Sequence, residues 1–466
     1  MQQACGNGLK DGALNERAGD SVSSADWLYL NVLAPVLVSY VKWVLAEAVR
    51  SKKRRLYFLA RDGYQMYLVA EQLCKAWNLD VECRYLYVSR YAIRVPEYHL
   101  IGEKCLERIC IGGIDVTFEK IMKRAALSEE EALVVADECG YREKYHTLLH
   151  YQEVMQLKNI LRNSTHFFEY VYAHSKEAYP KAIGYFKQEG LLDSVPYALV
   201  DSGWIGTLQQ SLQNLIDSVK VENNTNLSNQ IEGYYFGLYE LPTEAEKENY
   251  HAFYFRPNGN IRRKVHFSNS LFEAVFSAPD GMTIGYEEQQ DGSFRPVFDQ
   301  KEHPNQEQIR KNVELLNIYL QEYLSQNTGE GLANNYEIRR QLWHADLKKQ
   351  AAEQEIQMVE GLLSKFMGEP TSFELEAYGG ILFSDDVLED DLKKVSADLS
   401  DTEIQNQSFW NKTLSMLGIK KAEIHESAWI EGSIVKNGNN VGHNLRQAAR
   451  YKYFVYLRKW LKKRKY

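Results

Sequence analysis

Residues 55–64, Arg-Leu-Tyr-Phe-Leu-Ala-Arg-Asp-Gly-Tyr, join a short apolar run to a polar turn that contains a glycine. The apolar run Leu56–Ala60 has the length of a buried strand, and residues 66–77 follow it with apolar side chains at helical spacing. A second strand is predicted at Arg84–Ser89. A strand, a helix and a strand in this order form a crossover unit with parallel strands. The sequence therefore predicts an α/β fold with a mostly parallel, Rossmann-like sheet, and a ligand site beyond the carboxyl ends of its strands.

The rest of the chain extends this pattern. Further buried strands are predicted at Tyr197–Val200, Gly233–Leu238 and Ala252–Phe255. Polar residues without an apolar period open the chain, and long stretches at helical spacing dominate its last third. The predicted organisation is a flexible arm over residues 1–25, an α/β catalytic core over 26–300 with a helical insert at about 117–190, and a mainly helical C-terminal region with a basic tail over 301–466.

Composition bears on partners and location. A net charge of −8 over 466 residues argues against the basic surface of a nucleic-acid binder. The six cysteines show no CxxC spacing, which favours reduced thiols and a cytoplasmic protein. Residues 28–49 resemble a membrane span, but Asn31, Lys42 and Glu47 interrupt the run, so a core helix is expected. The positively charged tail after Arg446 fits either a peripheral contact with the inner face of the cytoplasmic membrane or a solvated helix end.

Two strand-to-helix turns carry the residues suited to chemistry. In residues 200–207, Val-Asp-Ser-Gly-Trp-Ile-Gly-Thr, the acidic Asp201 precedes a loop with two glycines and Thr207 at the predicted helix start. Glycines let backbone N–H groups approach a phosphate, and a helix N-terminus favours negative charge. Asp201 is placed to accept hydrogen bonds from sugar hydroxyls. The alternative is a plain turn in which an aspartate lies near the helix start.

The earlier turn, Ala60–Tyr64, places a cation and a carboxylate at a neighbouring strand end. Arg61 could bind phosphate oxygens in bidentate fashion, and Asp62 could hold Mg²⁺ directly or through water. Ser89 and Arg90 end the next strand, so three strand ends converge on anion-binding chemistry. The alternative for Arg61 and Asp62 is an ion pair with each other that closes the turn.

At this point the sequence resembles a known family. The segments LYFLARDGY at 56–64, YLYVSRYAIRVP at 85–96 and ALVDSGWIGTLQQSL at 198–212 resemble the divergent, glycan-directed phosphoribosyltransferase domain of bacterial dual-domain ribofuranosyltransferases. The similarity runs from about Leu28 to Tyr286 and includes GYYFGLY at 233–239 and LFEAVFSAPDGMTIGY at 271–286. The common phosphoribosyltransferase loop has two adjacent acids and a longer span, whereas here Ser202 takes the second acidic position.

The resemblance implies a division of roles at the site. Asp201 would bind the ribose hydroxyls, and the 5-phosphate would be cradled by Ser202, Gly203, Trp204, Ile205, Gly206 and Thr207. The pyrophosphate would face Arg61, Asp62 and Gly63, with Mg²⁺ at Asp62, and the neighbouring Tyr64, Ser89 and Arg90 would also bind substrate.

A general base near the acceptor completes the implied site. The candidates are Glu273, His266 and Asp62, because a carboxylate or imidazole can take the proton of an acceptor hydroxyl. His266 lies among basic residues, so the alternative is an exposed residue of a basic loop. For Glu273 the alternative is a carboxylate that stabilises a helix start. The predicted catalytic set is Asp62, Asp201 and Glu273.

The implied reaction is transfer of 5-phosphoribosyl from phosphoribosyl pyrophosphate to a hydroxyl of a lipid-linked glycan, in O-antigen or capsule assembly, with release of pyrophosphate. The dual-domain proteins also carry a phosphatase with a DxD-type motif, and this sequence has no such motif ahead of the region. A separate phosphatase would then act on the product. Two alternatives stay open: a haloacid-dehalogenase-like sugar-phosphate phosphatase, and a non-catalytic scaffold in a polysaccharide assembly complex.

Overall fold

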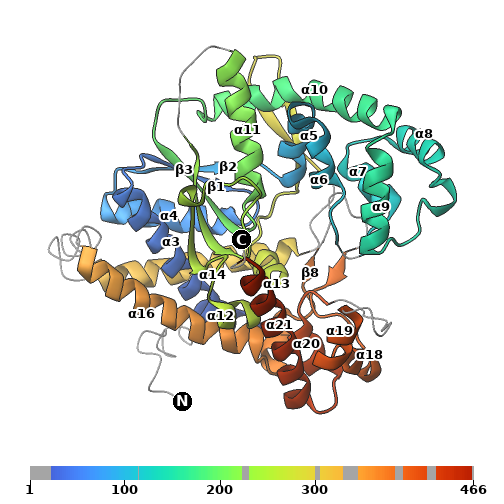
Figure 1. Cartoon of the computed structure of the whole chain (residues 1–466). Helices are drawn as coiled ribbons and strands as arrows, with labels where there is room; N and C mark the ends of the chain where they lie inside the picture. Colours follow the sequence, from blue (N-terminus) through green and yellow to red (C-terminus); the bar gives the residue numbers. More distant parts are fainter. Residues whose placement is uncertain are drawn as a thin grey trace.

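The sheet at the centre of the protein is parallel throughout. The computed structural model describes residues 22–113, 115–222, 230–299, 305–328, 345–383, 392–416 and 427–463. Five strands pair in the order β2-β1-β3-β4-β5, and every pair is parallel (Figure 1). The strands are β1 (Arg55–Leu59), β2 (Glu82–Leu86), β3 (Tyr197–Trp204), β4 (Glu232–Leu238) and β5 (Tyr250–Phe255). The predicted α/β fold is confirmed. All five strands overlap their predicted ranges, but β2 begins two residues earlier and ends three residues earlier than the predicted Arg84–Ser89.

Helices cover both faces of this sheet. On one face α3 (Ala34–Arg50) and α4 (Gly63–Trp77) share a core with the β1 side chain of Phe58, whereas Tyr57 points into a second core. That second core includes side chains from α5 (Arg90–Ile101), α10 (Thr165–Gln188) and α11 (Thr207–Glu222). The helix after β1 and the helix after β3 thus lie on opposite faces. The neighbouring carboxyl ends of β1 and β3 are the switch point, where such sheets bind ligands.

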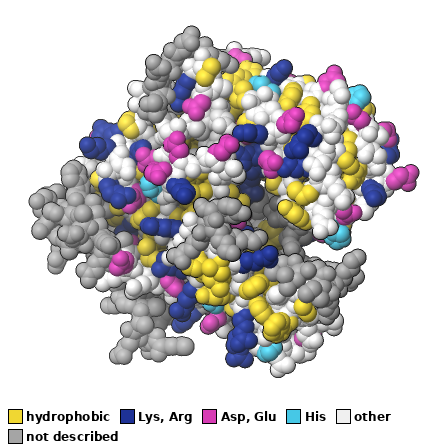
Figure 2. All heavy atoms as spheres, in the orientation of Figure 1, with side chains coloured by type: hydrophobic (Ala, Val, Ile, Leu, Met, Phe, Trp, Pro, Cys, Tyr) yellow, Lys and Arg dark blue, Asp and Glu magenta, His cyan; other side chains and the backbone are white. Residues whose placement is uncertain are grey.

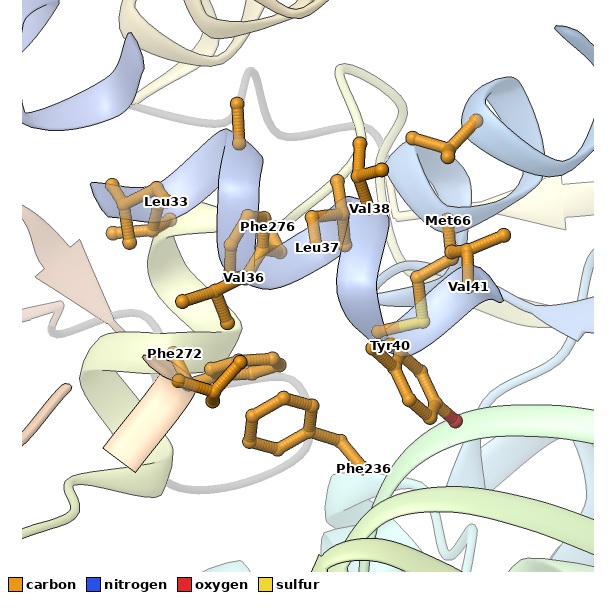
Figure 3. Close-up of a cluster of buried hydrophobic side chains, with 14 of the residues drawn as sticks. Leu33, Val36, Leu37, Val38, Tyr40, Val41, Met66, Phe236, Phe272 and Phe276 are labelled. Atoms are coloured by element: carbon orange, nitrogen blue, oxygen red, sulfur yellow. The ribbon is translucent and has the colours of Figure 1, made fainter. Parts of the chain in front are cut away.

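The apolar stretch near the N-terminus is a core helix. It runs from α2 (Ser24–Leu28) through η1 (Tyr29–Leu33) into α3, and it is long and apolar enough to cross a membrane. Figure 3 shows its side chains, among them Val36, Leu37 and Tyr40, packed against Phe236 of β4 and Phe272 of the later helix α13. Pro35 lies in the first turn of α3, directly after the π-helical turn η1 of this continuous helix.

The helical insert begins earlier than predicted, because α5 follows β2 directly and every helix from there to α10 lies between β2 and β3. It has its own hydrophobic core. Its helices are α5, η2 (Gly102–Cys105), α6 (Leu106–Ile109), α7 (Phe118–Arg124), α8 (Glu129–Cys139), η3 (Arg142–Lys144), α9 (Tyr151–Leu161) and α10. The predicted capping box is confirmed: Ser128 Oγ accepts from Glu131 N, and Glu131 Oε2 accepts from Ser128 N.

The C-terminal region shares the main core. Leu316 of α14 (Gln306–Thr328), Val359 of α16 (Ala345–Leu363) and Trp429 pack in the cluster that holds α3 and α4. The remaining elements are η4 (Lys247–Asn249), α12 (Ile261–Val265), α13 (Asn269–Val275), the antiparallel hairpin β6 (Thr283–Glu288) and β7 (Phe294–Phe298), η5 (Ser364–Gly368), α17 (Ser372–Tyr378), β8 (Leu382–Phe383), β9 (Lys393–Lys394), α18 (Asp401–Asn406), α19 (Phe409–Met416), α20 (Ile430–Asn437) and α21 (Val441–Lys463). The predicted arm lies almost wholly outside the described residues.

Candidate active site

A hydrogen bond joins the two predicted turns. The paired part of β1 and β3 ends at Phe58 and Val200. Asp62 lies four residues beyond the first and Ser202 two residues beyond the second, and Ser202 Oγ donates to Asp62 Oδ2 at 2.5 Å. Arg61 and Asp62, both within the described residues, form no ion pair with each other, so the reading of a mutual pair that closes the turn is wrong. Asp62 instead faces β3.

Glu273 brings a third carboxylate to these strand ends. It lies in the second turn of α13, whose N-terminus is capped by Ser268, so it is not a helix-start carboxylate. Trp204 at the end of β3 donates its indole N–H to Glu273 Oε1. Arg90 Nη2 lies 3.9 Å from the same oxygen, and 29% of the Glu273 side chain is exposed. The carboxylate is thus held in place yet reachable from solvent.

The three carboxyl groups act on one another electrostatically. Burial, then the charges of Asp62 and Glu273, raise the pKa of Asp201 to about 8. Burial, then the charge of Asp62, raise the pKa of Glu273 to about 7, although Arg90 and the hydrogen bond from Trp204 lower it. Burial also raises the pKa of Asp62, against the hydrogen bond from Ser202 and the charges of Arg61 and Arg90. Perturbed carboxyl groups of this kind cluster at functional sites.

Arginines surround the acids. Arg61 and Arg90 lower the pKa of Asp62, so both lie close enough to act on it. Arg94, one turn after Arg90 on α5, donates from Nη2 to Thr207 Oγ1 at 3.1 Å, at the first residue of α11. Burial lowers the pKa of Arg94 to about 10, and its Nε has no hydrogen-bond partner in the described part of the chain. On the face drawn in Figure 2, Lys and Arg side chains gather between the sheet and the helical insert.

The predicted phosphate loop is shorter than expected. β3 continues through Trp204, because Gly203 pairs with Gly237 and Trp204 with Leu238 of the neighbouring strand. Only Ile205 and Gly206 separate the strand from α11, so the prediction that Ser202, Gly203 and Trp204 belong to a loop is wrong. Asp201, six residues before α11, is not a helix cap either.

Several predicted ligand residues have structural roles. The Trp204 ring is buried among Phe255, Phe267 and Phe272, and reaches the site only through its bond to Glu273. Ser89 caps α5, because its Oγ accepts a hydrogen bond from Ala92 N. The same hydroxyl donates to the carbonyl of Thr283.

Two more of the predicted residues pack against the sheet. A Cβ on Gly63 would lie 2.9 Å from the Phe58 carbonyl carbon, so this glycine allows α4 to pack against β1. Half-buried Tyr64 makes an edge contact with Tyr85, at 5.3 Å between ring centroids.

His266 lies apart from the acids. It ends α12, and a Cβ on Gly368 would meet its ring at 2.5 Å, so it faces the C-terminal region. Burial lowers its pKa; the charges that act on it are those of Glu431 and Glu369, which raise the pKa, and of Lys452 and Arg262, which lower it. The reading as an exposed residue of a basic loop is also incomplete, since the side chain is half-buried.

Sequence reasoning overlooked Arg94 and Asp280. Arg94 follows Arg90 at a spacing of four residues, which places both on one helix face, and this was the available signal. Asp280 lies near the first turn, where its charge raises the pKa of Tyr64 after burial, and Tyr87 Oη lies 3.5 Å from Asp280 Oδ2.

The donor set fits a Mg²⁺ ion that is completed by substrate. Within the described ranges no group of three or more His, Cys, Asp or Glu is arranged to hold a metal. Mg²⁺ in phosphate-transfer sites is bound by one or two carboxylates together with substrate phosphates and water. Asp62 and Asp201 could supply the two carboxylates, because their mutual repulsion would be relieved by a cation. Comparison of the chain with protein families finds no match, and comparison with curated proteins finds none.

Proposed function

We propose that this protein transfers 5-phosphoribosyl from phosphoribosyl pyrophosphate to a glycan hydroxyl and releases pyrophosphate. The observation that carries the proposal is the meeting of three carboxyl groups with Arg61, Arg90 and Arg94 at the switch point between β1 and β3. A donor with phosphates at both ends of a ribose needs cations and N–H groups around its phosphates, and acceptors for its hydroxyls. Both kinds of group converge there.

In the proposed reaction the acceptor hydroxyl oxygen bonds to C1 of the ribose while the bond from C1 to the pyrophosphate oxygen breaks. Glu273 takes the hydroxyl proton, because a pKa of about 7 suits a base that works at neutral pH. Asp201 binds the ribose hydroxyls. Arg61 and Arg90 stabilise the negative charge that develops on the leaving pyrophosphate.

The helix end supplies the remaining anion site. Thr207 and the N-terminal N–H groups of α11, together with Arg94, would bind the 5-phosphate. Mg²⁺, bound with the pyrophosphate by Asp62, would neutralise charge on the leaving group. Ser202 keeps the Asp62 carboxylate oriented toward that position through their hydrogen bond.

Calorimetry with phosphoribosyl pyrophosphate and Mg²⁺ tests the proposal. We expect binding by the native chain, and loss of pyrophosphate release in Asp201→Asn and Arg61→Ala with the fold intact. The matched control is Lys187→Ala, an exposed cation of α10. No binding of the donor favours the scaffold; release of phosphate from a sugar phosphate without acceptor favours the phosphatase. Unchanged turnover in both variants excludes this site.

The proposed pathway extends to partners. The product keeps its 5-phosphate, so we propose that a separate phosphatase removes it, in the cytoplasm, during O-antigen or capsule assembly. We also propose that the protein touches the anionic inner membrane surface. Trp410 of α19 is 67% exposed, and Tyr453 and Leu461 of α21 are each 49% exposed. In Figure 2 hydrophobic and basic side chains lie side by side where these C-terminal helices form the face.

A further inference from the structure

An open groove follows the edge of the sheet. β5 is the last strand in the order, and the groove beside it is lined by its residues Tyr250, His251 and Ala252 and by Trp43, Glu47 and Arg50 of α3. It encloses about 410 Å³, within the range of small-ligand sites. Arg256, Pro257 and Asn258, just beyond the carboxyl end of β5, also line it. The groove therefore reaches from the start of the strand past its end.

Two aromatic rings form fixed platforms in this groove. Trp43 is half-buried and lies 6.1 Å from Tyr40 and 5.7 Å from Phe253 between ring centroids. Tyr250 is half-buried and stacks on Tyr235 at 6.0 Å with an interplanar angle of 12°. Because neighbouring rings hold them, these side chains lose little conformational freedom when a ligand packs on them. The partly positive C–H bonds of a sugar ring suit the negative face of an aromatic ring.

The charges in the groove favour an anion. Lys247 and Arg256 are exposed and form no ion pair with any residue that the structure describes. Arg50 also lines the groove, and it pairs with Glu47, the one carboxylate among the lining side chains. Two cations are thus left without a partner beside the aromatic platforms.

A chain of side-chain contacts links the groove to Glu273. Pro257 and Asn258 line both this groove and a small pocket formed with Tyr239 and with Tyr456 of α21. Tyr239 lies 5.9 Å from Trp204 between ring centroids, and Trp204 donates to Glu273. On the other side, Tyr250 abuts Gly206, where an added Cβ would lie 2.7 Å from its ring.

We propose that this groove binds an acidic saccharide, the chain of the glycan acceptor, with its sugar rings on Trp43 and Tyr250 and its anionic groups at Lys247 and Arg256. The role of this saccharide as the acceptor rests on the proposed function, whereas its binding to the groove does not. A saccharide that lies along β5 reaches the shared residues Pro257 and Asn258, and the packed rings of Tyr239 and Trp204 lie between these residues and Glu273.

The test measures saccharide binding without any donor. Tetragalacturonic acid is titrated into the full chain at low and at physiological salt, with its carboxyl methyl ester as the uncharged probe of equal length. We expect the acid to bind, the ester to bind at least several-fold more weakly, and Lys247→Ser/Arg256→Ser to weaken the acid about tenfold, as expected for two exposed ion pairs. The matched control is Lys176→Ser/Lys187→Ser, two exposed cations of α10, which should change affinity less than twofold.

The outcomes separate the two proposals. Saccharide binding without donor binding supports the groove and contradicts phosphoribosyl transfer. Donor binding without saccharide binding contradicts the groove alone. Equal affinity in both double variants, or equally tight binding of a four-residue oligonucleotide, also overturns the groove, because the site would then not distinguish an acidic saccharide.

Discussion

The pKa of Glu273 gives a quantitative test of the acid cluster. Glu273→Gln keeps an oxygen for the indole N–H of Trp204 and removes the charge. Burial and the charge of Asp62 raise this pKa from 4.5 to about 7. The folded chain therefore holds the proton more tightly than the unfolded chain, and ionisation of Glu273 destabilises the fold progressively as pH rises from 4.5 to about 7. Above that range the penalty is complete; below 4.5 it is absent.

The expected size follows from the same values. A rise of about 2.5 pH units corresponds to ~3.5 kcal/mol at ~1.4 kcal/mol per unit. Because 29% of the side chain is exposed, solvent screening reduces the figure, and we expect ~2 kcal/mol. The free energy of unfolding of Glu273→Gln and of the native chain is measured with urea in EDTA at pH 5 and at pH 8. The difference between variant and native chain should favour the variant by this much more at pH 8 than at pH 5. Exposed Glu248→Gln serves as the control. If the difference in free energy of unfolding between variant and native chain did not depend on pH, burial and the charge of Asp62 would not raise the pKa of Glu273.

Three other predictions concern positioning and the surface. Trp204→Phe removes the donor to Glu273, so the pKa of Glu273 rises. The rise of kcat with pH for pyrophosphate release, which reports the ionisation of a general base, should therefore move to higher pH. KM for the donor should change less than kcat. Ser202→Ala removes the bond to Asp62, and calorimetry should show donor affinity with Mg²⁺ falling ~10-fold, the loss expected for one hydrogen bond to a charged group; unchanged affinity would exclude Asp62 from the leaving-group site. Trp410→Ser/Leu461→Ser should reduce co-sedimentation of the full chain with phosphatidylserine vesicles several-fold, whereas Tyr151→Ser, an equally exposed aromatic of α9, should not; equal pelleting contradicts membrane contact.

β1, β3, β4 and β5 were predictable because each contains a short, buried apolar run. The edge strand β2 was placed less accurately, because only Leu86 of its five residues is buried. The length of β3 was not predictable, since it depends on β4 continuing beside it. Gly203 and Gly237 lie so close that a Cβ on Gly203 would meet the Gly237 carbonyl oxygen at 2.5 Å. In the sequence these glycines signalled a loop, and in the sheet they allow two backbones to approach.

The β6–β7 hairpin could also have been predicted from the sequence. Asp291 and Gly292 separate two short runs, and Gly292 adopts φ +80° in the turn. Such a dipeptide between strands is a strong local hairpin indicator. The hairpin matters to the site because the carbonyl of Thr283 in β6 accepts from Ser89, which fixes the start of α5 and thereby Arg90.

Site residues divide by how far their position depends on packing. Asp62 follows β1, and Asp201 lies in the neighbouring β3 just beyond its pairing with β1, so the order of apolar runs and acids alone predicted that they would lie close together. Arg94 and His266 lie on helices whose orientation only tertiary contacts set. Arg94 turns toward Thr207, whereas His266 turns toward Gly368. Both side chains are chemically suited to a site, but packing brings Arg94 to the site and turns His266 away from it.

Helix α21 connects the proposed membrane surface to the site, which restricts how the tail can be tested. Tyr456 stacks on Tyr239 at 5.7 Å, and Lys459 Nζ donates to Glu240 at 2.7 Å, so one side of the helix packs against the end of β4. Tyr453 and Leu461 remain half exposed on the same helix. Removing α21 would take away the side chain that packs on Tyr239, the neighbour of Trp204, as well as the exposed side chains proposed to meet the membrane. A truncated chain that loses both activity and vesicle binding therefore proves neither role. Only exposed-face substitutions separate them: if these abolish vesicle binding and leave donor turnover in solution intact, the helix serves the membrane and the site through different faces.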